Sequence, residues 1–332
     1  MTDNPSTRYG YAFALGLVIA WSAWITPARA DDKACGLRRA AEIPAKIEDG
    51  RLLIKMRLDD HDVWMKIGTD EPESEIAWQT AKQLNLPYHD LREGAVIDDA
   101  GKPLRHFVKV HTVGLGDLKT HDIDFMVQGE SNPTAPALQD GTFGADFLTA
   151  YDVEFDLAHG EVNLFFPDHC PGKVVYWTTS YFTIPFKLDL SRHAVFPVTL
   201  DGHVVQASLD TAAVDSTLNS SLARRVFNVD PIGGGAKPDG QEIMSSGAGL
   251  PFYLHRFGDF EIGDIAFHNT EIEILPDSVN KALRRIEQPR GEHQLNTNQE
   301  MQMNIGLHHL SRIRFYIAYG EQTIYMSTAD AN

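Results

Sequence analysis

The sequence predicts a mainly β protein made of two similar lobes, and two observations carry this prediction. Residues 58–84 lie over residues 200–226 without a gap when the numbering shifts by 142, and a second block around Gly144 repeats around Gly306 with a shift of 162. Apolar and polar residues alternate through both copies, which is typical of half-buried strands. Two blocks repeated in one order indicate an internal duplication, and a repeat of half the chain is too long for a solenoid unit.

Composition places the chain among ordinary globular proteins. Of its 332 residues, 43% are hydrophobic and 23% are charged, which is enough apolar material for a sizeable core. The formal net charge of −17 argues against nucleic acid as a partner, because phosphate binding needs a basic patch. The 14 histidines form no His-Glu-x-x-His or Cys-x-x-Cys motif, so we expect neither a metal nor a cofactor.

Residues 1–30 have the pattern of a secretory signal peptide. Arg8 supplies the positive charge, residues 11–25 are apolar, and Ala28-Arg29-Ala30 fits a cleavage site. An uncleaved anchor is the alternative, but the apolar core is short for a span of about 20 residues. We therefore expect an exported protein, periplasmic or secreted, without stable membrane insertion after cleavage.

The chain has two cysteines, Cys35 and Cys170, which flank the first lobe. In an exported protein, two cysteines so placed favour a disulfide. Two free buried thiols are the alternative.

We expect lobe 1 to span residues 31–168. Alternation predicts strands in its first part, a helix over residues 75–86 that ends before Pro87, and a hairpin over residues 95–113. The expected strands are residues 42–47, 52–58, 63–67, 122–127 and those within 151–166.

A linker over residues 169–181 separates lobe 1 from lobe 2, residues 182–332. Prolines, a glycine and Cys170 mark this boundary, while residues 177–187 either begin lobe 2 or pair with lobe 1. Asp201-Gly202 between alternating runs is a strong hairpin signal. In the rest of lobe 2 we expect a helix over residues 219–226, an exposed loop over 231–240, strands within 257–275 and a polar segment over 276–299.

The hairpin of lobe 2 leads directly to Asp210-Thr211-Ala212-Ala213. A carboxylate at the end of a buried strand is costly unless it is hydrogen-bonded or used, although a turn cap alone would also explain it. Together with the duplicated block order, this stretch resembles the active-site loop of retroviral-type (retropepsin-like) aspartic peptidases. The resemblance covers residues 42–165 and 182–327 and implies two acid-protease-type β-barrel lobes in a bilobal, pepsin-like chain, with an active-site cleft between them.

The resemblance implies a catalytic role for Asp210 and active-site loops that contain Thr211 and Ala212. It pairs Thr211 with Thr69, whose hydroxyls brace the two loops across the lobe interface. By position in the family, the hairpins at residues 95–113 and 242–254 are flaps, and Ser246, Gly247 and Gly249 are expected to line the substrate, since glycine lets a backbone approach closely.

Lobe 1 departs from the family pattern where its aspartate belongs. It has Gly68-Thr69-Asp70, so glycine stands at the position equivalent to Asp210. Asp70 is the candidate for a makeshift partner, although its side chain starts two residues further along and is not expected to superpose on the missing carboxylate. The sequence thus predicts either an aspartic endopeptidase that retains Asp210 and cuts an extended peptide or protein, or a non-catalytic pseudopeptidase that only binds such a peptide.

Overall fold

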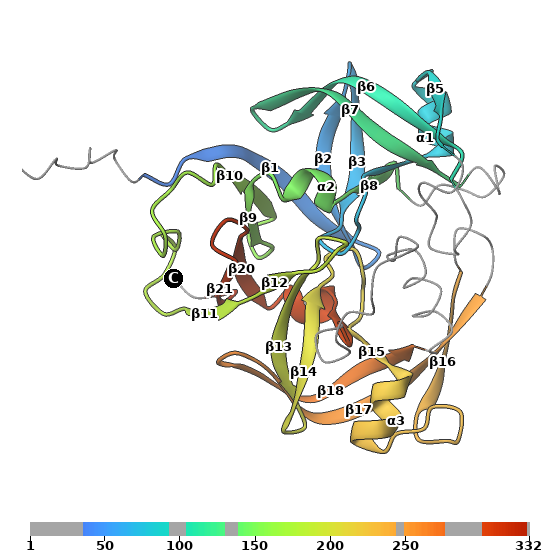
Figure 1. Cartoon of the computed structure of the whole chain (residues 1–332), viewed down its shortest axis with the longest axis vertical. Coiled ribbons are helices and arrows are strands. Elements are labelled where there is room, and N and C mark those ends of the chain that lie inside the picture. Colours follow the sequence, from blue (N-terminus) through green and yellow to red (C-terminus); the bar gives the residue numbers. More distant parts are fainter. Residues whose placement is uncertain (1–35, 93–103, 130–138, 244–248, 276–300, 331–332) are drawn as a thin grey trace, which may run out of the picture. The chain divides into compact units, whose positions relative to one another are not determined.

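The computed structural model describes residues 36–92, 104–129, 139–243, 249–275 and 301–330. Within these ranges the chain is mainly β, with two closed six-stranded barrels and short helices, and it has the bilobal acid-protease-type fold (Figure 1). The predicted signal segment, Cys35, Ser246, Gly247 and residues 276–299 lie outside the described residues.

The first barrel is a closed sheet of strands from lobe 1. Its order is β2-β3-β8-β4-β7-β6, and pairing of β2 with β6 closes the ring. The strands are β2 (Arg51–Leu58), β3 (His61–Ile67), β4 (Glu75–Ala77), β6 (His106–Leu115), β7 (Leu118–Gln128) and β8 (Gly141–Phe143), with β5 (Tyr88–Asp90) at the edge and α1 (Trp78–Gln83) and α2 (Ala145–Leu148) beside them.

The second barrel repeats this arrangement with later residues. Its order is β13-β14-β19-β15-β18-β17, and β13 pairs with β17 to close it. Its strands are β13 (Ala194–Leu200), β14 (His203–Leu209), β15 (Thr217–Asn219), β17 (Gly249–Ile262), β18 (Ile265–Leu275) and β19 (Met303–Ile305), with β12 (Lys187–Leu188), β16 (Lys237–Ile243), α3 (Ser220–Phe227) and α5 (Leu307–Leu310) outside the ring. The duplication inferred from the sequence therefore extends to strand pairing.

A six-stranded sheet joins the two lobes. Three strands come from lobe 1, β1 (Arg39–Glu48), β9 (Asp152–Asp156) and β10 (Glu161–Phe165), and three from lobe 2, β11 (Phe182–Pro185), β20 (Ile313–Ala318) and β21 (Thr323–Thr328). The lobes meet where β9 pairs antiparallel with β20, with Phe155 opposite Phe315 and their rings stacked. The β11 strand pairs with β21, so residues 182–185 belong with lobe 2.

Two predicted elements differ from the structure. The helix expected from residue 75 starts at Trp78, because residues 75–77 form β4, whose Ile76 is fully buried between β7 and β8. The loop expected over residues 231–240 ends early, because β16 begins at Lys237 and tolerates Pro238 and Gly240 at a register shift opposite β17. In both places, pairing with a distant strand overrides local propensity.

A glycine in each lobe lies where the chain folds back under the predicted active-site loop. A Cβ on Gly144 would lie 2.7 Å from the carbonyl oxygen of Glu71, and one on Gly306 would lie 2.3 Å from that of Asp215. Only glycine fits such a close approach. Each of these glycines also donates its N–H to a buried serine hydroxyl, Ser74 in lobe 1 and Ser216 in lobe 2, at 3.0 Å. Among the residues that the structure describes, no helix has the length and hydropathy to cross a bilayer.

Candidate functional site

The loops after β3 and β14 are joined by two buried threonines. The hydroxyl of Thr69 donates to the carbonyl oxygen of Leu209, and that of Thr211 donates to the carbonyl oxygen of Ile67 at 2.6 Å. Each hydroxyl also accepts the other threonine's backbone N–H, at 3.1 and 3.3 Å. These reciprocal bonds fix the two loops against each other across the lobes.

Asp210 is held by its own loop. Its Oδ1 accepts the backbone N–H groups of Ala212 and Ala213, both at 3.0 Å. Ala212 is not among the residues with positive φ, so its methyl group causes no backbone strain there. The second oxygen, Oδ2, remains directed toward lobe 2 strand β19 and lies 3.4 Å from Asn304 Nδ2.

Asp70 is held by side chains from the opposite lobe. Its Oδ1 accepts the Ser208 hydroxyl at 2.9 Å, and its Oδ2 accepts Asn304 Nδ2 at 2.6 Å. Ser208 and Asn304 are neighbours because β14 and β19 pair in parallel with these two residues in register. Strand pairing within lobe 2 therefore forms a cradle for a carboxylate that belongs to lobe 1.

One amide joins the two carboxyl groups. Asn304 Nδ2 lies within hydrogen-bond distance of an oxygen of Asp70 and of an oxygen of Asp210. The structure thus brings together the two acids that the sequence separates by 140 positions. Although Asp70 starts two residues beyond the vacant position, its carboxyl group reaches the neighbourhood of Asp210.

The surroundings of Asp70 favour its neutral form. Burial raises the pKa of Asp70 to about 8; the positive charge of His193 opposes this rise, and the negative charges of Asp210 and Glu71 add to it. The side chain is 11% exposed. Two close carboxyl groups resist simultaneous ionisation, so the negative charge of Asp210 favours the protonated form of Asp70.

The space above Gly68 is filled by another acidic residue. A Cβ built on Gly68 would lie 2.4 Å from Glu71 Cγ and 3.0 Å from Glu71 Cβ. The Cβ and Cγ atoms of Glu71 therefore occupy the space that an aspartate side chain at position 68 would need. Lys66 Nζ lies 4.0 Å from the Glu71 carboxylate.

Sequence reasoning missed the groups that surround Asp70. Ser208 carried a signal, since it is a polar residue one position before Asp210 in an apolar strand. Asn304, beside the repeated glycine motif, carried a weaker one. His193 and Asp189 gave none, because their role depends on contact with the other lobe.

The remaining predictions concern the two flaps, the disulfide and metal binding. The hairpin expected over residues 95–113 is placed differently, because the strand that pairs with β6 there is β5, residues 88–90, before the expected start. The hairpin expected over residues 242–254 is formed by β16 and β17, and Gly249 begins β17. Residues 93–103 and 244–248, between these arms, lie outside the described residues. With Cys35 also outside them, the disulfide stays a prediction. No group of three or more His, Cys, Asp or Glu side chains within the described ranges is arranged to bind a metal.

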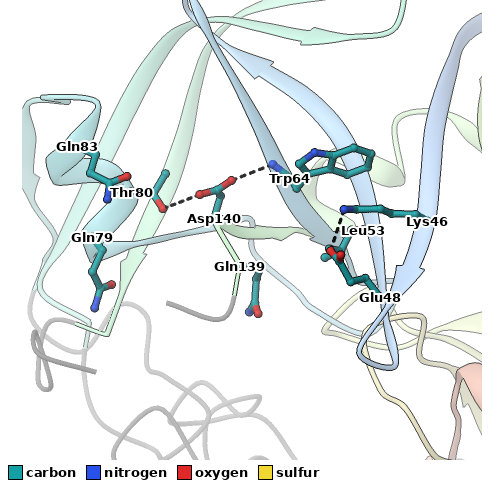
Figure 2. A pocket seen from close by; sticks show the side chains of 9 residues that line it. All are labelled: Lys46, Glu48, Leu53, Trp64, Gln79, Thr80, Gln83, Gln139 and Asp140. Atoms are coloured by element: carbon teal, nitrogen blue, oxygen red, sulfur yellow. Dashed lines mark hydrogen bonds and ion pairs between the residues drawn. The ribbon is translucent and has the colours of Figure 1, made fainter. Parts of the chain in front are cut away.

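A separate polar pocket of about 430 Å³ opens on lobe 1 (Figure 2), and neither Asp70 nor Asp210 lines it. Its Asp140 accepts the backbone N–H of Trp64 at 2.9 Å and the Thr80 hydroxyl at 3.1 Å, and Lys46 lies over the Trp64 ring. In the same lining, the buried Oε1 of Gln139 has no hydrogen-bond partner within the described residues. The pocket contains none of the residues around the two acids.

Comparison with known proteins identifies no family. No family model matches the chain, and no curated protein matches it. Among solved structures, the crystal structure of basic 7S globulin from soybean is similar over 90% of this chain and 98% of that chain, with a TM-score of 0.48 and 8% sequence identity.

Proposed function

We propose that this protein is an aspartic-type endopeptidase of the retropepsin-like group, in which Asp210 and the displaced Asp70 form the catalytic pair. The observation that carries the proposal is the Asn304 amide, which lies within hydrogen-bond distance of both carboxyl groups. An acid pair that shares one proton is what this chemistry needs. The proposed substrate is an extended segment of a peptide or protein, and no cofactor takes part.

In the proposed reaction, ionised Asp210 takes a proton from water while the oxygen of that water attacks the scissile carbonyl carbon. Neutral Asp70 donates its proton to the carbonyl oxygen, which gives a diol intermediate. Asp210 then protonates the leaving nitrogen as the C–N bond breaks, and Asp70 recovers its proton from the collapsing diol. Because the pKa of Asp70 is about 8, hydrolysis is expected from acidic to neutral pH and is expected to decline above about pH 8.

The test is cleavage of a peptide library by the mature protein, followed by mass spectrometry across pH 3 to 10. Asp210→Asn and Asp70→Asn are each expected to reduce kcat/KM by about 10²–10⁴-fold, as loss of a general acid or base does. Asp215→Asn is the matched control, because Asp215 lies in the same loop with an exposed side chain that is 41% accessible. Cleavage that survives Asp210→Asn would refute the proposal.

A second candidate function is peptide binding without hydrolysis. It is favoured by the stem of Glu71 above Gly68 and by the low exposure of the Asp70 carboxyl group. It predicts saturable binding of fluorescent extended peptides with no turnover at any pH. Export is part of both proposals, and intact mass of the secreted protein, with Asp31 as its first residue, is the check.

A further inference from the structure

A turn of lobe 2 lies against the loop that holds Asp70. This turn, residues 189–193, joins β12 to β13. Arg192 Nη1 donates to the carbonyl oxygen of Pro72 at 3.1 Å, and His193 Nε2 lies 3.1 Å from the carbonyl oxygen of Asp70. The same His193 nitrogen lies 3.6 Å from Asp70 Oδ1, and the imidazole is 4% exposed.

Both ring nitrogens of His193 face acceptors. Nδ1 lies 2.9 Å from Asp189 Oδ2, while the other Asp189 oxygen accepts the backbone N–H groups of Ser191 and His193. A carbonyl oxygen never donates, so Nε2 must carry a proton to bond Asp70 O, and Nδ1 must carry one to bond a carboxylate. Burial raises the pKa of Asp189, but hydrogen bonds and charge from His193 outweigh it and lower the pKa overall. An ionised Asp189 thus accepts a hydrogen bond from Nδ1 of a doubly protonated His193 imidazole.

We infer that His193, backed by Asp189, is a positioning residue that places a buried positive charge against Asp70 and tunes it as the acid of the pair. The inference rests on the proposed function, in which Asp70 is that acid. The equivalent turn of lobe 1 has Asp49, Gly50 and Arg51, so the buried histidine is a feature of lobe 2.

The charged groups around Asp70 set the direction of the effect. Asp210 and Glu71 face it with negative charge, His193 faces it with positive charge, and Lys66 lies against Glu71. Burial and the two acids favour the neutral form of Asp70, whereas the charge of His193 and the hydrogen bond from Ser208 favour the ionised form. His193 is thus the one of these two groups that acts through charge, and it helps to keep the Asp70 proton transferable near neutral pH. Without that cation, Asp70 becomes a weaker acid.

The test compares His193→Gln and Asp189→Asn with the wild-type protein and with His268→Gln. Glutamine keeps hydrogen-bonding capacity and removes the charge. His268 is a matched control because it pairs with Asp259 at 2.7 Å on the exposed surface of lobe 2. Two measurements are made: the pH dependence of kcat and KM, and the titration of the Asp70 carboxyl carbon by NMR, which does not depend on turnover.

In both variants, the alkaline limb of kcat and the Asp70 titration are expected to move upward by about one pH unit or more, as loss of a nearby opposite charge does. We expect kcat at neutral pH to fall about tenfold with little change in KM. The double variant is expected to match His193→Gln alone, because Asp189 acts through the imidazole. His268→Gln is expected to leave both measurements unchanged.

An unshifted Asp70 titration in folded His193→Gln and Asp189→Asn would overturn the inference, even if Asp70→Asn still abolished hydrolysis. If His193→Gln fails to fold, Asp189→Asn decides alone, because it leaves the imidazole in place. Conversely, a shifted titration in a protein that hydrolyses no peptide would support the electrostatic role and reject the proposed function. The two failures are therefore distinguishable.

Discussion

The two proposed active-site loops come from the same repeat but hold their carboxylates in different ways. Asp210 stands first in its loop and is held by backbone amides of that loop. Asp70 stands third in its loop and is held by Ser208 and Asn304 from the other lobe. The loops share the threonine bonds and a serine that accepts a glycine N–H, so the framework was retained while the acid moved.

This difference shows what a duplicated site can change. Thr69 and Thr211 fix the relative position of the loops, and the pairing of β9 with β20 fixes the lobes beneath them. With that framework constant, a carboxylate two residues away can reach the neighbourhood of Asp210 if the opposite lobe supplies donors.

Copying the lobe 2 loop into lobe 1 tests whether the displaced acid replaces the missing one. The triple variant Gly68→Asp, Asp70→Ala, Glu71→Ala gives lobe 1 the sequence Asp-Thr-Ala-Ala and removes most of the side chain that fills the space above position 68. Relative to Asp70→Asn, we expect kcat/KM for peptide hydrolysis to rise by about 10²–10⁴-fold.

The control for this transplant is Gly68→Asp alone. Its Cβ would lie 2.4 Å from Glu71 Cγ, so we expect a loss of stability of about 1–3 kcal/mol and no gain in rate. A folded triple variant that is as inactive as Asp70→Asn would show that the lobes are not interchangeable at this position.

Substitution of Arg314 in the central sheet tests an ion pair that one lobe makes with acids of the other lobe. Arg314 occupies the position that Asp152 holds in lobe 1, and it bonds Glu154 at 2.7 Å and Asp156 at 2.6 Å. Arg314→Met removes the guanidinium from two buried acids, which keep only their other bonds to Asn163, Tyr176 and His159, so we expect a loss of about 3–5 kcal/mol in denaturant unfolding. The exposed Arg256, paired with Glu271, is the control, with an expected loss below about 1 kcal/mol for Arg256→Met.

The titration of His309 tests a second difference between the lobes, because the equivalent position in lobe 1 is Phe147. Burial lowers the pKa of His309 to about 4, and the ring lies between the hydroxyls of Ser216 and Thr270. Because the folded pKa is below the unfolded value of about 6.5, its contribution is complete above pH 6.5 and decreases as pH falls toward 4, by up to about 3 kcal/mol.

His309→Phe is expected to remove this acid dependence from the unfolding free energy, while lowering stability at pH 7 because two buried hydroxyls lose their partner. The exposed His111, which pairs with Asp122 in lobe 1, provides the control His111→Gln, which is expected to keep the wild-type acid slope. An unchanged slope in His309→Phe would contradict the assignment.

Substitutions of Thr69 and Thr211 test the reciprocal hydrogen bonds that the two loops have in common. Thr69→Val and Thr211→Val each remove one hydroxyl donor and leave a buried carbonyl and an N–H without their partner, so we expect losses of about 1–3 kcal/mol each. The two losses are expected to be similar, and serine at either position is expected to retain most of the stability. Thermal unfolding of the four variants is the measurement, and a strongly unequal pair of losses would mean that the loops are not equivalent.

Much of the architecture was predictable from the sequence because the sequence contains two copies of the same block order. Two constant offsets align β3 with β14 and β8 with β19, and alternation located most of the strands. Short strands such as β4 escaped prediction, because residues 75–77 are extended only through their pairing with β7 and β8. Local propensity carries no information about such distant partners.

The sequence by itself determined the duplicated, two-lobed β organisation and the position of Asp210 at the end of a strand, and the resemblance it carries implied the pairing of Thr69 with Thr211. Only the tertiary structure decided that Asp70 lies with Asp210, because this depends on how two separately encoded lobes pack. The same holds for Ser208 and Asn304, which become neighbours through parallel strand pairing, and for His193, which contacts a loop of the other lobe. Residue spacing along the chain sets a side chain's starting point, whereas its end point is set by the donors and acceptors that folding brings around it.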